Sequence, residues 1–156
     1  MKVAFFLPHL TDGGVAHSSF ILAGQFLAHG HDVDILTIRP NAEMTEVPPD
    51  GTRVIDLRAR RTATAIPALS LYLRREKPDG VISVQHFANT AAVIAKMLVR
   101  SGIKLILRER MSIDAALRRD KGFRGVVLPR LMRSLYRRAD AVVANSSANA
   151  ERLCDL

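Results

Sequence analysis

Short aliphatic runs alternate along the chain with longer segments in which apolar residues recur every three or four positions. Lys2–Leu7 has the length of a buried strand, whereas Ala16, Phe20, Ala23 and Leu27 have the spacing of one helix face. Strands that alternate with amphipathic helices are typical of βα units around a parallel sheet. The pattern therefore predicts an α/β fold, an open parallel sheet with helices on both faces.

The element boundaries follow from the same pattern and from Gly, Pro and Ser signals between the elements. The predicted strands are Lys2–Leu7, Asp32–Ile38, Arg53–Leu57, Gly80–Val84, Lys104–Arg108 and Ala141–Ala144. The predicted helices are Val15–His29, Ala65–Lys77, Ala88–Arg100 and Val126–Arg138, and a last helix follows a Ser146 or Ser147 cap. Gly30 and Gly102 are expected to end the first and third of these helices.

The 156 residues show no repeat and no low-complexity linker, so we expect a single domain over residues 1–156. The last helix reaches Asp155 and Leu156 without a Gly, Asn or Pro stop signal. We therefore expect a fragment of a longer protein, or a domain that needs a second part.

Composition indicates a soluble globular protein, with 48% hydrophobic and 24% charged residues. The single cysteine, Cys154, cannot form an intrachain disulfide, and no Cys/His cluster has the spacing of a metal site. The apolar N-terminal run ends at Pro8, which is too short for a signal peptide, and no apolar stretch reaches the ~20 residues of a membrane span. These features predict a cytoplasmic protein without a bound metal.

The formal net charge of +8 favours partners that carry phosphate: nucleic acid, anionic lipid or a small molecule. Aromatic residues make up only 5% of the chain and no DNA- or RNA-binding motif is present, which argues against nucleic acid. Basic residues beside apolar ones suit the anionic inner face of a membrane, although a charge run can also be a solvated face. The basic clusters are Arg58/Arg60/Arg61, Arg74/Arg75/Lys77, Arg118/Arg119/Lys121/Arg124 and Arg130/Arg133/Arg137/Arg138.

Gly13 and Gly14 lie in the loop between the first predicted strand and the first predicted helix. Ligands of open α/β sheets bind at the carboxyl ends of the strands, and a helix N-terminus attracts phosphate. The alternative is a tight turn that needs glycine only for its geometry. The loop matches neither the G-x-G-x-x-G fingerprint nor a P-loop, which disfavours a nicotinamide-binding domain or a P-loop nucleotidase.

Polar residues also follow the fourth and fifth predicted strands. His86 can bind a sugar hydroxyl or move a proton, or it can be a plain surface histidine with Asn89 as a helix cap. Glu109, between Arg108 and Arg110, can orient a guanidinium toward an anion, or the three can form a solvated ion-pair cluster.

The opening of the chain resembles the N-terminal half of a GT-B glycosyltransferase of the large retaining family 4. That family begins with a strand, a Gly-Gly loop, a helix, and then a strand that starts Gly-His-(Asp/Glu)-Val. The matching residues here are Gly13, Gly14, Gly30, His31, Asp32 and Val33.

The middle of the chain resembles the members of that family that build bacterial surface polysaccharides. The matching residues are Pro78, Asp79, Ile82, Ser83, Asn89, Glu109 and Arg110. Arg108 and Met111 depart from the Ser and Asn of that sub-group, so the loop after the fifth strand differs in detail. The segment from Leu135 to Leu153 resembles the family's approach to its interdomain crossing.

The resemblance implies a Rossmann-like, acceptor-binding domain and an enzyme that transfers sugar from a nucleoside-diphosphate sugar. The acceptor would be a glycan or a lipid-linked molecule, in surface polysaccharide or glycolipid synthesis. His86 would be catalytic, and Gly13, Gly14, Asn89, Glu109 and Arg110 would bind substrate, without a metal or cofactor.

The family's donor site lies mainly on a C-terminal domain with two glutamates separated by seven residues, and no glutamate pair here has that spacing. The resemblance therefore implies that this chain lacks the nucleotide-sugar domain and is inactive alone. The alternative is a non-catalytic module that docks on a membrane and recruits a separate donor-binding subunit.

Overall fold

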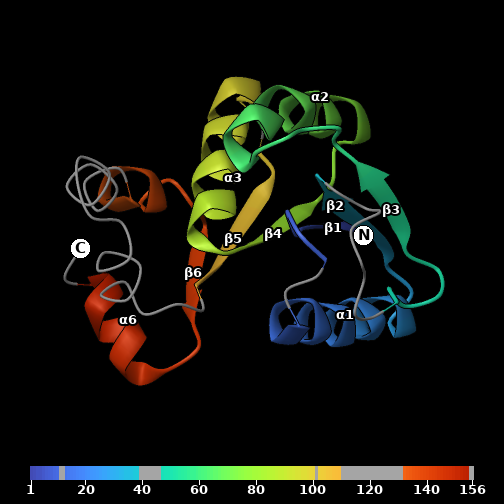
Figure 1. The fold of residues 1–156 in the computed structure, drawn as a ribbon, viewed down its shortest axis with the longest axis horizontal. Coiled ribbons are helices and arrows are strands. Elements are labelled where there is room, and N and C mark those ends of the chain that lie inside the picture. The colour runs from blue at the N-terminus through green and yellow to red at the C-terminus, as the bar shows by residue number, and fades with distance from the viewer. Residues whose placement is uncertain (11–12, 39–46, 101, 110–131, 155–156) are drawn as a thin grey trace.

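The structure is a computed structural model that describes residues 1–10, 13–38, 47–100, 102–109 and 132–154 (Figure 1). Six parallel strands form one sheet in the order β3-β2-β1-β4-β5-β6. The strands are β1 (Lys2–Phe6), β2 (Asp32–Thr37), β3 (Arg53–Asp56), β4 (Gly80–Val84), β5 (Lys104–Glu109) and β6 (Ala141–Ala144). The predicted open parallel sheet is confirmed.

Helices cover both faces of the sheet, as Figure 1 shows, with α1 on one face and α2 and α3 on the other. The helices are α1 (Gly13–Ala28), α2 (Ile66–Glu76), α3 (His86–Val99) and α6 (Ser147–Cys154), with a 3₁₀ turn η1 (Thr62–Ala65) before α2. Residues 132–136 are also helical. Within the described residues, no helix is long and apolar enough to cross a membrane.

The sheet is buried on both faces, which explains why its strands read as continuous apolar runs. In β1, Ala4 and Phe6 face the core beneath α2 and α3, whereas Val3 and Phe5 face the core beneath α1. On α3, small side chains line the buried face and allow close contact with the sheet. They are Ala88, Ala91, Ala92 and Ala95.

The predicted bounds of β4 and β6 are confirmed, and the other strands differ by a residue at their carboxyl ends. The prediction that Asn89 caps α3 is wrong, because α3 begins three residues earlier, at His86. The predicted glycine stop at Gly102 is also wrong. Arg100 takes the left-handed conformation instead (φ 51°), and its N–H closes the helix on the Lys96 carbonyl at 3.0 Å. That hydrogen bond offsets the steric cost of a side chain there.

Two other predicted helix ends are confirmed. Gly30 has a φ of +75°, as a left-handed cap requires. At α6, the Asn149 N–H donates to Ser146 Oγ at 3.3 Å, so Ser146 is the cap. Of the predicted helix over residues 126–138, only residues 132–138 lie in the described part, and residues 132–136 of these are helical. The basic cluster at residues 118–124 lies outside the described residues.

Candidate functional site

The strand order reverses between β1 and β4, which are neighbours in the sheet although 73 residues lie between the end of β1 and the start of β4 in sequence. The loops that follow two such strands leave in opposite directions and open a crevice at the carboxyl edge. Gly13 and Gly14 begin α1 after β1, and His86 begins α3 after β4. The fold thus places the two predicted motifs after the carboxyl ends of neighbouring strands, where ligands of open α/β sheets bind.

The chain between β1 and α1 is held on the neighbouring strand. The Pro8 carbonyl accepts hydrogen bonds from Thr37 Oγ1 at 3.1 Å and from the Ile38 N–H at 3.2 Å. Leu10 is completely buried, and its packing in the core beneath α1 holds the loop against the sheet. Residues 11 and 12 lie outside the described part, and α1 starts immediately afterwards at Gly13 with no acidic residue in its first turn. The first turn of α1 therefore carries no acidic side chain, although Asp12 directly precedes it in sequence.

Gln85 joins β4 to α3 in a backbone conformation that side chains rarely adopt, with φ 80° and ψ 142°. Its N–H donates to the Arg108 carbonyl at 3.2 Å, and its carbonyl accepts the Asn89 N–H at 2.8 Å. These bonds hold the strained peptide between β5 and α3. Sequence reasoning missed this residue, because nothing in a Val-Gln-His run signals a positive φ.

His86 is the first residue of α3 and is buried, with 9% of its surface exposed. Its ring lies against the half-exposed Phe87, with 4.2 Å between the ring centroids. The alternative of a plain surface histidine is therefore wrong, because the His86 side chain is buried at the carboxyl edge of the sheet.

A buried polar cluster lies beside His86 and joins three elements. Asn89 Nδ2 lies 3.3 Å from Glu109 Oε2, 3.3 Å from Tyr136 Oη and 3.2 Å from the Arg108 carbonyl. Tyr136 donates from its hydroxyl to Glu109 Oε2 at 2.7 Å. Asn89 and Glu109 were predicted from the sequence, whereas Tyr136, 27 residues beyond Glu109, was not.

Burial, and then the charge of Glu109, raise the pKa of Tyr136 above its usual range. Tyr136 therefore keeps its proton and remains a donor to the carboxylate. Asn89 has no exposed surface, and its Oδ1 has no hydrogen-bond partner among the described residues. The contacts of Asn89 and Tyr136 with Glu109 fix the position of its carboxylate at the carboxyl end of β5.

Of the two arginines that flank Glu109, Arg108 lies at the same edge. Arg108 donates from Nη1 to Ser19 Oγ at 3.4 Å, which links β5 to α1. Arg110 lies outside the described residues, so its predicted place in the site stays a prediction. No group of three or more His, Cys, Asp or Glu side chains within the described ranges has the arrangement of a metal site.

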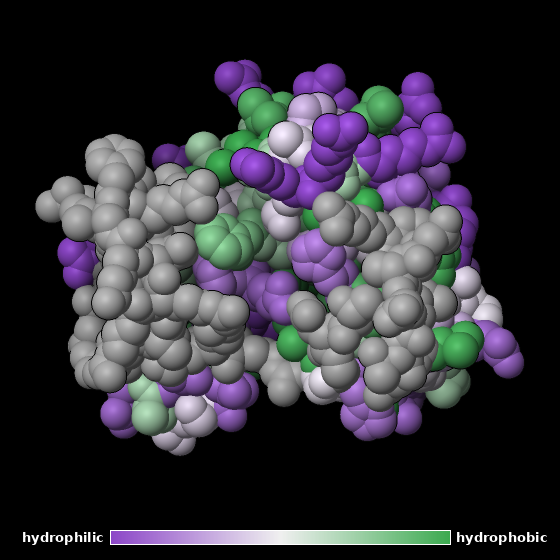
Figure 2. All heavy atoms as spheres, viewed as in Figure 1, coloured by the Kyte–Doolittle hydropathy of each residue, from purple (hydrophilic) through white to green (hydrophobic). Residues whose placement is uncertain are grey.

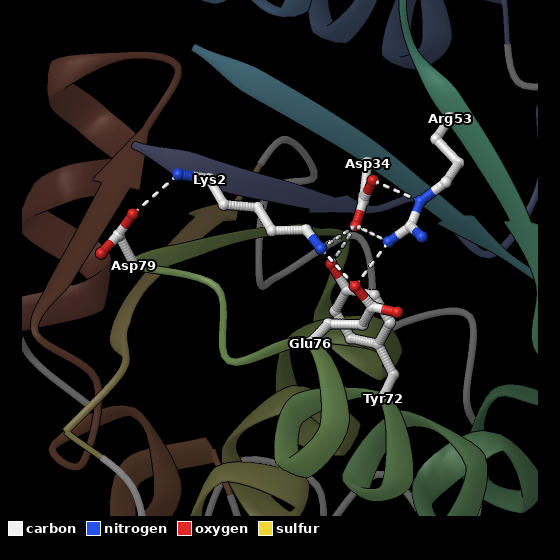
Figure 3. A network of polar contacts seen from close by, with 6 residues as sticks. All are labelled: Lys2, Asp34, Arg53, Tyr72, Glu76 and Asp79. Carbon is white, nitrogen blue, oxygen red and sulfur yellow. Dashed lines mark hydrogen bonds and ion pairs between the residues drawn. The ribbon is translucent and has the colours of Figure 1, made fainter.

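A network of charged and polar side chains lies away from this edge, near the amino ends of the strands (Figure 3). Arg53 binds Asp34 through Nε at 2.9 Å and Nη2 at 2.7 Å, and Tyr72 donates to the same carboxylate at 2.6 Å. Lys2 and Glu76 complete it. Because the network ties α2 to β1, β2 and β3, it is structural.

Comparison with known proteins agrees with the fold. The chain is similar to a lipopolysaccharide outer core galactosyltransferase WaaB structure (TM-score 0.67, 16% identity), covering 99% of this chain and 42% of that one. It is also similar to sucrose-phosphate synthase from Thermosynechococcus elongatus (TM-score 0.75, 13% identity), covering 99% of this chain and 45% of that one.

MurG from Acinetobacter baumannii shares the fold as well, with a TM-score of 0.62 and 16% identity over 93% of this chain and 41% of that one. The chain thus spans less than half the length of these structures. No curated protein sequence matches it. The family described as "Glycosyl transferase 4-like domain" matches residues 13–156. With its Rossmann-like sheet, this chain is a member of that family and has the fold of an N-terminal GT-B glycosyltransferase domain.

Proposed function

We propose that this chain is the acceptor-side domain of an enzyme that transfers sugar from a nucleoside-diphosphate sugar to a glycan or lipid-linked acceptor. The observation that carries the proposal is the crevice between β1 and β4, with the N-terminus of α1 on one side and His86 on the other. Surface polysaccharide or glycolipid synthesis is the proposed setting.

The chemistry of such a transfer explains the proposed roles. Cleavage of the donor's sugar–phosphate bond leaves negative charge on the departing diphosphate. The backbone N–H groups of Gly13 and Gly14, at the positive end of α1, would stabilise that charge. His86 would act at the sugar, either by binding a hydroxyl or by moving a proton.

The proposed acceptor side consists of Asn89, Glu109 and Arg110. Asn89 and Glu109 are buried and bonded to each other, so we assign them to the floor that shapes this side of the crevice. Arg110 follows Glu109 directly and would supply a cation toward an anionic acceptor.

The donor's nucleotide is proposed to be held mainly by a part of the enzyme that these 156 residues do not contain. An alpha-glucosyltransferase in complex with UDP has the same fold over 93% of this chain (TM-score 0.52, 17% identity). A donor of the UDP-sugar type is therefore a reasonable first choice for assays.

Gly14→Asp in the complete enzyme tests the phosphate role of the α1 N-terminus. We expect loss of sugar transfer, by about a hundredfold or more, because the carboxylate repels a diphosphate at the place where its charge develops. The fold should survive, because an acidic residue in a first helical turn stabilises the helix by about 0.3–1 kcal/mol.

Gly14→Asn is the matched control, since it has the same shape without the charge. Transfer rates with a UDP-sugar donor and thermal unfolding of both variants are the measurements. If Gly14→Asp transfers sugar as fast as the unaltered enzyme, the anion role of this helix end is wrong.

A peripheral membrane module is the second candidate function, and one surface favours it. On α2 and α3, exposed apolar residues lie among exposed basic ones, and Figure 2 shows hydrophilic and hydrophobic residues side by side there. Arg74 of α2 donates to the Leu98 carbonyl of α3 at 3.4 Å, so the two helices form one surface. We call it the α2–α3 surface. Its exposed residues are Leu71, Arg74, Arg75, Met97, Leu98 and Arg100. Such a surface suits an anionic bilayer.

A further inference from the structure

Three arginines follow the carboxyl end of β3, at the edge of the sheet where α1 and α3 also begin. Arg58, Arg60 and Arg61, which we call the β3 arginines, lie between β3 and η1. All three are exposed, and within the described residues none of them forms an ion pair. Guanidinium groups bind carboxylates in a bidentate geometry, so this segment is complementary to a ligand with several negative charges.

The backbone at Arg58 is strained. Its φ is 50°, in the left-handed region, where glycine avoids the steric cost of a side chain. The Asp56 side chain holds this turn, because its Oδ1 accepts the Arg58 N–H at 2.7 Å. Asp56, an acidic residue only two positions away, therefore binds the backbone of Arg58 and makes no ion pair with its guanidinium group. Strained residues cluster at ligand-binding segments, which supports a binding role for this turn.

The segment that carries the β3 arginines packs against α3. The 3₁₀ turn η1, which follows Arg61 directly, contacts α3. Ala59 and Ala65 pack in the same core as Ala88 and Ala91 of α3. In Figure 2, hydrophilic residues gather over the segment between β3 and α2. The β3 arginines and the first turn of α3 thus belong to one face of the carboxyl edge.

Phe87, in the first turn of α3, adds an apolar surface to this edge. Its side chain is 49% exposed and lies against the buried His86, with 4.2 Å between the ring centroids. The faces of a sugar ring carry C–H groups, and contact with an aromatic ring removes this apolar surface from water. An inorganic anion gains nothing from such a ring. Phe87 and the β3 arginines together therefore favour a sugar chain that is also charged.

We propose that the ligand of this edge is an acidic glycan, a chain of sugars that carry carboxylates. One sugar ring stacks on Phe87, and carboxylates of neighbouring sugars accept hydrogen bonds from the β3 arginines. The inference rests on the proposed function in one respect, because it names the class of acceptor to which sugar is transferred. Binding of the glycan requires neither a donor nor transfer.

Hexagalacturonate, which carries one carboxylate on every sugar, is the probe. Its binding to the protein is measured by isothermal titration calorimetry without a sugar donor, beside neutral maltohexaose and a single-stranded DNA hexamer. We expect hexagalacturonate to bind, with an affinity that falls as salt rises, because exposed charges are screened. Maltohexaose lacks the charges and the DNA hexamer lacks the sugar carboxylates, so both should bind at least about tenfold more weakly.

Two variants place the ligand. Arg58→Gln with Arg60→Gln should weaken the binding of hexagalacturonate by about fivefold or more, because two carboxylates lose their partners. Phe87→Ala should weaken it by about fivefold, whereas Phe87→Tyr, which keeps the ring, should not. The matched control is Arg137→Gln with Arg138→Gln. It removes the same charge at exposed residues that precede the amino end of β6, and it should leave the affinity unchanged.

The proposal is wrong if hexagalacturonate fails to bind, or if maltohexaose or the DNA hexamer binds as tightly. It is also wrong if the arginine and Phe87→Ala variants keep the full affinity, or if the control pair weakens binding equally. Because no donor is present, these outcomes do not depend on sugar transfer. A complete enzyme that binds hexagalacturonate but transfers no sugar would contradict the proposed function and leave the binding site intact.

Discussion

Gln85 shows how a single residue carries strain at the candidate site. Its left-handed φ costs about 1–3 kcal/mol in general, and it lies between the strand that ends at Val84 and the helix that begins at His86. The bonds to Arg108 and Asn89 maintain this conformation. Because Gln85 directly precedes His86, its fixed backbone conformation also fixes the direction in which α3 begins at His86.

Gln85→Gly is expected to relieve that strain and to raise the free energy of unfolding by about 1 kcal/mol, after the entropy cost of glycine is subtracted. For a domain of this size the melting temperature should rise by about 2–4 °C. Gln85→Ala is the control, because it removes the side chain but keeps the strained φ, and it should give no gain. Thermal unfolding of the three proteins checks this. An equal or lower melting temperature for Gln85→Gly would show that the backbone is not strained.

Helix α2 is joined to the sheet by charged and polar contacts, from Tyr72 to Asp34 and from Glu76 to Lys2 and Arg53. Burial tends to raise the pKa of Asp34, but hydrogen bonds from Arg53 and Tyr72, with the charges of Arg53 and Lys2, lower it overall (Figure 3). A carboxyl whose pKa is lowered by folding stabilises the fold above its unfolded pKa of about 3.9. That contribution disappears as the pH falls through the lower, folded value.

Asp34→Asn should therefore reduce the free energy of unfolding at pH 7 by about 1–3 kcal/mol, because it removes the buried carboxylate that accepts hydrogen bonds from Arg53 and Tyr72. The difference from the unaltered protein should shrink between about pH 4 and pH 2. Asp32→Asn, at an exposed position on the same strand, is the control and should change little. Urea unfolding at a series of pH values measures both effects. A constant difference down to pH 2 would mean that the Asp34 charge does not stabilise the fold.

At the scale of the whole molecule, the net charge of +8 and the α2–α3 surface predict binding to anionic membranes. Vesicles that contain about 30% phosphatidylglycerol should bind the protein, and binding should weaken steeply as salt rises, because each Lys or Arg near the surface contributes about 1 kcal/mol of screened attraction. Neutral phosphatidylcholine vesicles should not bind it.

Arg74→Glu with Arg75→Glu should reduce that binding, whereas the charge-matched pair Arg137→Glu with Arg138→Glu, exposed outside the α2–α3 surface, should leave it nearly unchanged. Vesicle co-sedimentation compares the two double variants. If the Arg74/Arg75 variant binds anionic vesicles as well as the unaltered protein, the α2–α3 surface is not the membrane contact.

The amino-acid pattern was sufficient to predict the parallel sheet, the places of all six strands and the two motifs at the crevice. The physical reason is that burial on both faces requires an uninterrupted apolar run in each strand, and such runs can be read without knowledge of contacts. Gly30 and Ser146 were readable for a similar reason, since a helix end is decided by a few consecutive residues.

Contacts between distant segments needed the folded chain. Tyr136 reaches Glu109 and Asn89 because residues 132–136 pack into the same core as β5 and α3. Arg53 meets Asp34 because β3 lies beside β2. The positive φ of Gln85 depends likewise on hydrogen bonds from β5 and α3. A one-dimensional pattern records which side chains are apolar, but not which polar ones become neighbours. The chemistry at the carboxyl edge of the sheet therefore arises from the packing of elements that are remote in sequence.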